Sequence, residues 1–168
     1  MDAHGRTEAA VLIPLYGWPH SPGVVFTERR HDLRRHAGEI SFPGGRRDRG
    51  EELLDTALRE AEEEIALSPD AVEIVGALPP IGTFVTGYKV YPFVGLIEPG
   101  LRFEPNPREV ESVLLAPLDD LVAGYGKRRL IRRGVPIRTD SYLVGGKLVW
   151  GATARILGDL LVRLDRQR

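Results

Sequence analysis

A run of glutamates after a glycine-rich loop restricts this chain more than any other feature. Within residues 38–67, the sequence places Glu60 and three further glutamates at 62–64 inside five positions. Two such charges about 6 Å apart repel each other by roughly 3 kcal/mol at an effective dielectric constant of 20. A fold that keeps these side chains together therefore needs a compensating positive charge beside them.

The apolar residues of the same stretch predict the helix that carries the glutamates. Four of them recur at spacings of four, three and four, which is typical of an amphipathic helix: Leu54, Leu58, Ala61 and Ile65. We expect this helix over residues 51–66, ended by the Ser-Pro pair at 68–69.

Three of the glutamates fall on one face of the predicted helix. At about 100° per residue, Glu60, Glu63 and Glu64 share a face about 100° wide, beside the apolar stripe, and Glu62 points away. Hard divalent cations bind carboxylate oxygens and leave room for substrate phosphates. Glu60 and Glu64 can therefore bind one Mg²⁺ or Mn²⁺ ion, with Glu63 reaching it or a bound water. An acidic face that is only solvated is the alternative.

The wider spacing resembles a known signature. Six positions fit the pattern G-x5-E-x7-R-E-x-x-E-E, which resembles the Nudix box of hydrolases that cleave a nucleoside diphosphate linked to another group: Gly45, Glu51, Arg59, Glu60, Glu63 and Glu64. The resemblance implies that Arg59 pairs with Glu51 and holds the loop against the helix. It also implies that the last three glutamates are metal ligands, with Glu63 the first candidate for helping to deprotonate water.

Two details of the box concern the backbone. We expect Gly44 and Gly45 to let the loop turn tightly and bring N–H groups near an anion. The box usually carries Gly where this chain has Ala66. A left-handed helix end at that position would cost Ala roughly 1 kcal/mol.

The residues just upstream narrow the resemblance to a subfamily. Eight positions within 25–45 look like the additional signature of coenzyme A pyrophosphatases: Thr27, Arg29, Arg34, Gly38, Phe42, Pro43, Gly44 and Gly45. Guanidinium groups suit phosphate oxygens well, so we expect Arg29 and Arg34 to contact the substrate. We expect Arg30, Arg35 and His36 to be solvated.

The resemblance implies hydrolysis of the diphosphate of coenzyme A or acyl-coenzyme A, giving 3′,5′-ADP and 4′-phosphopantetheine or its acyl form. One alternative keeps the chemistry and changes the substrate to ADP-ribose, a dinucleotide or an oxidised deoxynucleoside triphosphate. Another is a nucleotide-binding domain of the same fold without catalysis. Glu109 or Glu111 is the candidate for a further acid at the far wall of the site.

The rest of the chain predicts an α/β fold with a mixed sheet sandwiched between helices. Strand patterns occupy 9–17, 23–30, 40–42, 72–78, 88–97 and 111–118, and 128–138 and 141–150 follow as a late pair with Gly145 and Gly146 in a turn. The period of 151–166 predicts a second helix. We expect residues 1–168 to form one Nudix hydrolase domain.

Composition limits the remaining functions. The formal net charge is −1, which favours neither nucleic acid nor an anionic membrane as a partner, and the lack of cysteine excludes disulfides and thiolate sites. No leader-like or membrane-length apolar run is visible. We therefore expect a cytoplasmic enzyme with a small-molecule nucleotide substrate, and we consider a homodimer as its assembly.

Overall fold

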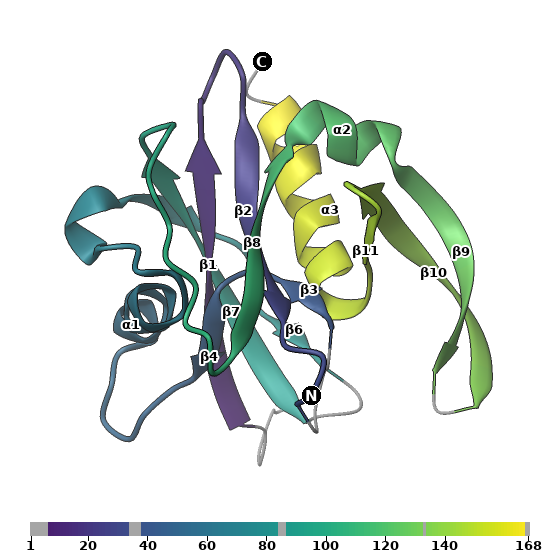
Figure 1. Ribbon diagram of the computed structural model, residues 1–168, viewed down its shortest axis with the longest axis horizontal. Coiled ribbons are helices and arrows are strands. Elements are labelled where there is room, and N and C mark those ends of the chain that lie inside the picture. Colours follow the sequence, from purple (N-terminus) through teal and green to yellow (C-terminus); the bar gives the residue numbers. More distant parts are fainter. Residues whose placement is uncertain (1–6, 34–37, 84–86, 133, 167–168) are drawn as a thin grey trace.

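The computed structural model describes residues 7–33, 38–83, 87–132 and 134–166 of the 168-residue chain (Figure 1). Its centre is a parallel pair of strands, β1 (Thr7–Tyr16) and β7 (Tyr88–Ile97), in register along their whole length. The other pairings of this sheet are antiparallel, so the sheet is mixed, as the sequence predicts.

Six more strands complete the large sheet. The strand order is β3-β2-β1-β7-β5, with β4 also paired to β1, β6 to β7 and β8 to β2. Their bounds are β2 Gly23–Arg29, β3 Ile40–Ser41, β4 Gly44–Arg46, β5 Glu73–Ala77, β6 Ile81–Gly82 and β8 Val110–Pro117. The sequence patterns locate β1, β2, β3, β5, β7 and β8 to within two residues, whereas β4 and β6, which contain glycine, are not predicted.

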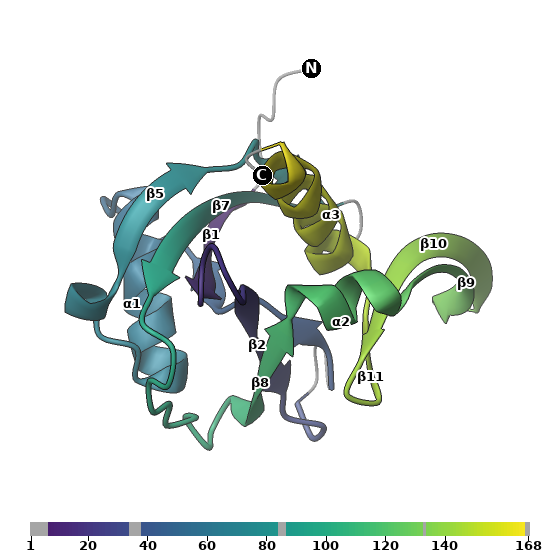
Figure 2. The ribbon, with the colours of Figure 1, turned by 90° about the horizontal axis from the view of Figure 1, so that it is seen from above.

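A helix covers each face of this sheet (Figures 1 and 2). Alternate residues of β1 and β2 point to opposite sides, and apolar residues on both sides pack against a helix. On one side, α1 (Leu53–Ile65) buries Ala57, Ala61 and Ile65 against Leu12 and Val25. On the other side, α3 (Gly151–Asp165) buries its own aliphatic face against neighbours of those residues, namely Ile13, Leu15, Val24 and Phe26. The predicted α/β fold with a sheet between helices is confirmed.

The apolar stripe of α1 differs from the prediction in one member. Ala57 is fully buried and packs in the core, while Leu54 is only half-buried and lies outside both core clusters. The helix ends at Ala66, whose φ of 58° and ψ of 31° are left-handed. The strained end that the missing glycine implies is therefore present.

A second sheet stands beside the first. The short helix α2 (Leu118–Ala123) leads into β9 (Tyr125–Arg132), β10 (Val135–Val144) and β11 (Lys147–Val149), in the order β11-β10-β9. Gly145 and Gly146 form the predicted turn, with φ of 56° and 74°, values that favour glycine in a tight hairpin. The prediction of one strand over 128–138 is wrong, because the chain turns there and pairs with itself.

The short 3₁₀ helix η1 (Pro69–Ala71) follows α1, as the Ser-Pro pair predicts. None of the helices in the described part of the chain is both long and apolar enough to cross a membrane.

Candidate active site

Gly45 lets helix α1 approach strand β4, and Gly44 lets β4 approach β1. A Cβ on Gly45 would lie 2.6 Å from the carboxyl carbon of Glu60, and one on Gly44 would lie 2.4 Å from the carbonyl oxygen of Ala10. Both glycines are paired with β1, and neither has a left-handed φ, so the prediction that they form a tight turn is wrong. The backbone N–H of Gly44 does meet an anion, the carboxylate of Glu64.

Arg59 is the cation that holds the start of α1 together. Its Nε donates to Glu51 at 2.8 Å, and its Nη1 donates to Glu60 at 2.9 Å and to Glu63 at 3.2 Å. The hydrogen bond from Arg59 is the main cause that lowers the pKa of Glu51 to about 2. Glu51 also accepts from the Thr56 hydroxyl at 2.7 Å. The implied pairing of Arg59 with Glu51 is thus observed, and the carboxylate of Glu51 stays ionised.

Glu60 and Glu64 are the two poorly solvated carboxylates of the site. Glu64 is only 8% exposed, although it was expected beside the buried stripe, and burial, followed by the charges of Glu60 and Glu109, raises its pKa to about 8. Burial also raises the pKa of Glu60, against the hydrogen bond from Arg59. Without further positive charge, this pair binds a proton at neutral pH.

Glu63 is much more exposed than that pair but lies beside it. Its side chain is 54% exposed and, like Glu60, accepts from Arg59. The charge of Glu63 raises the pKa of Glu60, and the charge of Glu109 raises the pKa of both Glu60 and Glu64. Glu109, from the segment before β8, is therefore a further carboxylate near those of α1.

The segment 104–109 brings Glu109 to the end of α1. The backbone N–H of Asn106 donates to the carbonyl of Glu64 at 2.8 Å, and that of Arg30 donates to the carbonyl of Glu109 at 3.1 Å. The register of β2 and β8 then shifts, so that Arg29 lies opposite Val110 and the preceding residue of β2 opposite Ser112. Glu111 is the extra residue of this bulge and contributes to neither raised pKa.

Of the two arginines expected to bind substrate, the structure describes only Arg29. Arg29 ends β2 on the α1 side, and its charge acts to lower the pKa of Glu64, so it lies near the acid pair. Arg34 lies outside the described residues, as do Arg35 and His36. Arg30 is not simply solvated, because it donates to the carbonyl of Pro107 at 2.8 Å and pairs with Asp32.

Comparison with known proteins identifies the family. The NUDIX domain matches residues 6–134 of this chain. The chain belongs to the Nudix hydrolases. It is 39% identical to the uncharacterized Nudix hydrolase NudL of Pectobacterium atrosepticum over 165 residues, covering 96% of this chain and 85% of that protein. It is 41% identical to NudL of Escherichia coli O1:K1 over 160 residues, covering 94% and 82%.

Solved structures share the Nudix fold at low sequence identity. The NUDIX domain of Shewanella oneidensis NrtR, solved with ADP-ribose, superposes with a TM-score of 0.65 at 15% identity, covering 95% of this chain and 89% of that one. A MutT/nudix family protein from Enterococcus faecalis gives 0.64 at 14% identity, covering 98% and 64%. At this identity the likeness concerns the fold alone.

The acids of this Nudix site fit a hard divalent cation. The ionised forms of Glu60 and Glu64 are poorly stabilised, because burial and the charge of Glu109 raise the pKa of both. In the described part of the chain, no three His, Asp or Glu side chains already converge on one point. Such a cation would therefore take part of its shell from water and substrate phosphate, as Mg²⁺ commonly does.

A buried cluster that the motifs do not reveal lies on the other side of β2. Glu28, 4% exposed, accepts from Lys147 Nζ, His31 Nε2 and Ser112 Oγ, each at 2.9 Å. Burial pushes its pKa up, but the hydrogen bonds outweigh burial and the pKa is lowered. The sequence does not show this cluster, because Lys147 is 119 positions from Glu28 along the chain. The one local sign is that Glu28 follows the apolar residues of β2.

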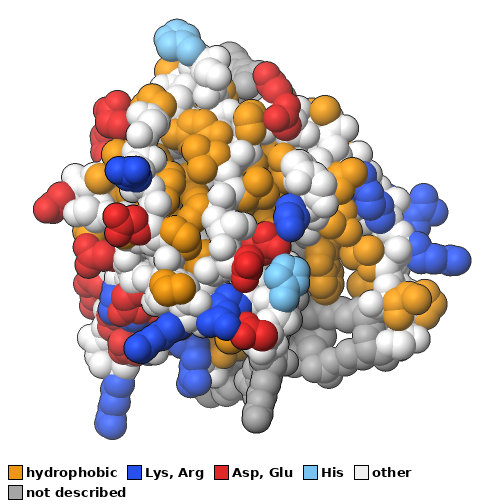
Figure 3. Space-filling model, in the orientation of Figure 1, with side chains coloured by type: hydrophobic (Ala, Val, Ile, Leu, Met, Phe, Trp, Pro, Cys, Tyr) orange, Lys and Arg blue, Asp and Glu red, His pale blue; other side chains and the backbone are white. Residues whose placement is uncertain are grey.

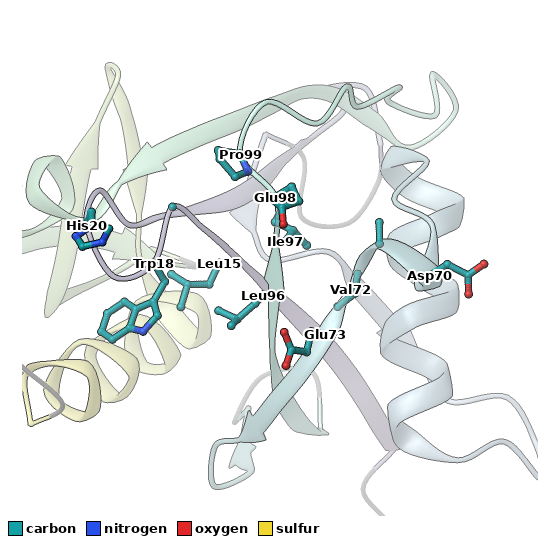
Figure 4. Close-up of a pocket in the computed structure, with 12 residues that line it drawn as sticks. Leu15, Trp18, His20, Asp70, Val72, Glu73, Leu96, Ile97, Glu98 and Pro99 are labelled. Atoms are coloured by element: carbon teal, nitrogen blue, oxygen red, sulfur yellow. The ribbon is translucent and has the colours of Figure 1, made fainter.

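A separate pocket of about 610 Å³ lies where β1 and β7 end (Figure 4). Leu15, Trp18 and Leu96 give it an apolar wall, with Glu73 and Glu98 beside them. Because β1 meets β4 at Ala9–Val11 and reaches this pocket only at Leu15, the pocket is at the other end of the strand from the acid pair.

Proposed function

We propose that this Nudix hydrolase cleaves the diphosphate of coenzyme A or acyl-coenzyme A. Membership of the family gives the coarser reaction, hydrolysis of a nucleoside diphosphate derivative. The observation that carries the proposal is the pair of buried Glu64 and partly buried Glu60 beside Arg29. The pair calls for a divalent cation, while Arg29 and the arginines that follow it suit a substrate with a phosphate beyond the diphosphate.

Each side chain has a role in this proposal. Glu60 and Glu64 would hold Mg²⁺ or Mn²⁺, which when bound neutralises phosphate oxygens and lowers the pKa of water. Arg59, fixed by Glu51, keeps Glu60 in place. Arg29 and Arg34 bind the phosphates. Gly45 leaves room for the carboxylate of Glu60, and the N–H of Gly44 donates to Glu64.

The reaction needs no covalent intermediate. The oxygen of water bonds to one phosphorus, the bond from that phosphorus to the bridging oxygen breaks, and a carboxylate accepts a proton from the water. Glu63 is our first candidate for that carboxylate, and Glu109 is the second because it faces the acid pair. The products are 3′,5′-ADP and 4′-phosphopantetheine or its acyl form.

Glu63→Gln and Glu109→Gln distinguish the two candidates. We expect kcat to fall by about 10²–10³-fold in the variant that lacks the proton acceptor, with KM little changed. Glu73→Gln, the same change at an exposed position of β5, is the matched control. Full activity in both variants would remove both residues from this role.

A second candidate substrate is ADP-ribose, because the NUDIX domain of NrtR, of the same fold, was solved with this nucleotide. A screen of coenzyme A, acetyl-coenzyme A, ADP-ribose, NADH and 8-oxo-dGTP with Mg²⁺ or Mn²⁺, with products identified by mass, tests the proposal. We expect the highest kcat/KM for a coenzyme A substrate. Tight nucleotide binding without turnover would instead support a non-catalytic domain.

We further propose that residues 1–168 act as one catalytic domain in the cytoplasm, on a small-molecule nucleotide and without nucleic acid or membrane as partner. The net charge of −1 supports this proposal. A homodimer is the smallest assembly that we propose.

A further inference from the structure

Strands β9 and β10 form a long hairpin that projects from the body of the molecule (Figures 1 and 2). We call residues 125–142 the arm. Residues 127–138 contain six of the 23 Lys and Arg residues and none of the 24 Asp and Glu residues. The rest of the chain therefore has seven more acids than cations. The NUDIX match ends at residue 134, so β10 lies wholly beyond the matched residues.

One face of the arm, the arm face, combines exposed cations with exposed apolar groups. The side chains of Tyr125, Lys127, Arg129 and Ile131 alternate onto this face, and Ile131 is 78% exposed. Arg138 of β10 lies directly opposite Arg129. Like charges at paired positions of a sheet destabilise it, so an acidic partner would stabilise this pair.

Nothing acidic neutralises the arm face within the described residues. Asp140 lies opposite Lys127 but accepts the hydroxyl of Tyr125, at 2.6 Å. Lys127, Arg129 and Arg138 make no ion pair in the described ranges. On the opposite face, by contrast, Arg128 is satisfied by Ser141 Oγ and the carbonyl of Gly124.

The outer surface of α1 carries the complementary charge. Glu52, Asp55 and Glu62 are exposed there, and none of the three forms an ion pair within the part of the chain that the structure describes. We call them the acid patch. Figure 3 shows acidic side chains gathered at the left edge, where α1 lies in Figure 1, and basic ones at the right edge, beside the arm.

The two surfaces match in scale. Asp55 and Glu62 are seven residues apart on a helix, or about 10 Å along its axis. Lys127 and Arg129 are two residues apart on a strand, or about 7 Å, and Arg138 is about 5 Å across from Arg129. Long cationic side chains span the remaining difference.

We propose that the arm face of one molecule binds the acid patch of a second copy of this chain. A second copy fits better than a nucleic acid or an anionic membrane, because the excess acids of the rest of the chain repel a polyanion. Tyr and Arg, both present on the arm face, are also enriched at protein interfaces. The contact joins two different surfaces, so it either forms twice across a two-fold axis in a dimer or repeats head-to-tail in a ring or short chains.

Sedimentation equilibrium of the full chain in 50 mM and 500 mM NaCl tests the proposal. We expect association at low salt that weakens at least tenfold at high salt, because exposed charges are screened. The arm variant Arg129→Glu/Arg138→Glu and the patch variant Asp55→Arg/Glu62→Arg should each be monomeric. The matched control for the arm variant is Arg163→Glu/Arg166→Glu, which makes the same charge change at exposed residues of α3 and its C-cap and should associate like the natural chain.

Mixing the arm variant with the patch variant gives the deciding result. Each has like charges on its own two surfaces, whereas the mixture restores opposite charges, so the two should associate with each other and not with themselves. Circular dichroism of each variant confirms that it is folded. A monomer at about 200 μM in low salt would overturn the proposal, as would variants that associate unchanged. Arm-dependent binding of an oligonucleotide or anionic vesicles by a monomeric chain would overturn it in favour of a polyanionic partner.

Discussion

Glu28 and Glu64 are both buried, on opposite sides of the large sheet, but the pKa of Glu28 is lowered and that of Glu64 is raised. Glu28 faces the β11 side, where three donors at 2.9 Å hold it ionised. Glu64 faces the β4 side, where the N–H of Gly44 is its hydrogen-bond donor, and its pKa rises to about 8. Both residues are under 10% exposed. Burial alone therefore does not mark a functional acid; the lack of compensating charge does.

Replacing each glutamate with glutamine should separate the two roles, and the effect on activity is the largest that we expect. Glu64→Gln should lower kcat/KM by about 10³-fold, since it removes one charge from the proposed cation site. Glu28→Gln should leave kcat of the folded enzyme within a few-fold. Steady-state assays at saturating Mg²⁺ measure both. Equal losses in the two variants would contradict the distinction.

The stability of the metal-free protein should depend on pH through Glu64. Its pKa is raised from 4.5 to about 8 in the folded state. A raised pKa favours folding at low pH, and this contribution is lost as the pH rises through 8. Urea titrations with EDTA should give a free energy of unfolding about 3–4 kcal/mol lower at pH 9 than at pH 5.

The matched control for this pH effect is Glu64→Gln, which should remove most of the difference. Glu51, with a pKa lowered to about 2, contributes a constant stabilisation above pH 4.5 and so does not alter the comparison. A natural chain whose stability does not change between pH 5 and pH 9 would show that Glu64 is compensated in solution.

Removing the charge of Glu28 should destabilise the fold more than removing the charge of its partner Lys147. Glu28→Gln should lower the free energy of unfolding by about 2–3 kcal/mol, because Lys147 and His31 lose a buried acceptor. Lys147→Met should cost less, about 1 kcal/mol, because Lys147 is 45% exposed and the other two donors remain. Chemical denaturation at pH 7 gives both values. A larger loss for Lys147→Met would reverse the assignment of the dominant partner.

The smallest effect should come from Ala66→Gly at the end of α1. Ala66 has a left-handed φ of 58°, which glycine adopts without strain. We expect a gain of about 0.5–1 kcal/mol and a rise in melting temperature of a few degrees, with kcat unchanged. Differential scanning calorimetry measures it. A destabilised variant would mean that the unfolded-state entropy of glycine outweighs the relieved strain.

Local sequence predicts the fold and the box well, because periodicity and cap residues act over a few positions. Helix α1 and the turn at Gly145 and Gly146 follow from nearby residues, while the pairing of Glu51 with Arg59 is what the resemblance to the Nudix box implies. The direction of a side chain depends on tertiary neighbours. A helical wheel places Glu63 beside Glu60, but only the folded structure shows that both accept from Arg59 and that Glu64 is the buried member of the three.

The features that the sequence could not predict involve residues far apart along the chain. Glu109 reaches the acid pair because the segment 104–109 bonds to the end of α1, and no local pattern distinguishes it from Glu111. The donor from Lys147 to Glu28 likewise depends on where the second sheet sits. Such contacts follow from topology, which short motifs do not contain.

The parallel pairing of β1 with β7 also bears on how the protein is made. The strand at residues 7–16 can pair with β2 and β4 early, but the partner of its other edge lies at 88–97, so in a chain emerging from the ribosome this edge stays unpaired until residue 97 has been synthesised. Until then, the surface of β1 that later packs in the core is open to chaperones and to other nascent chains.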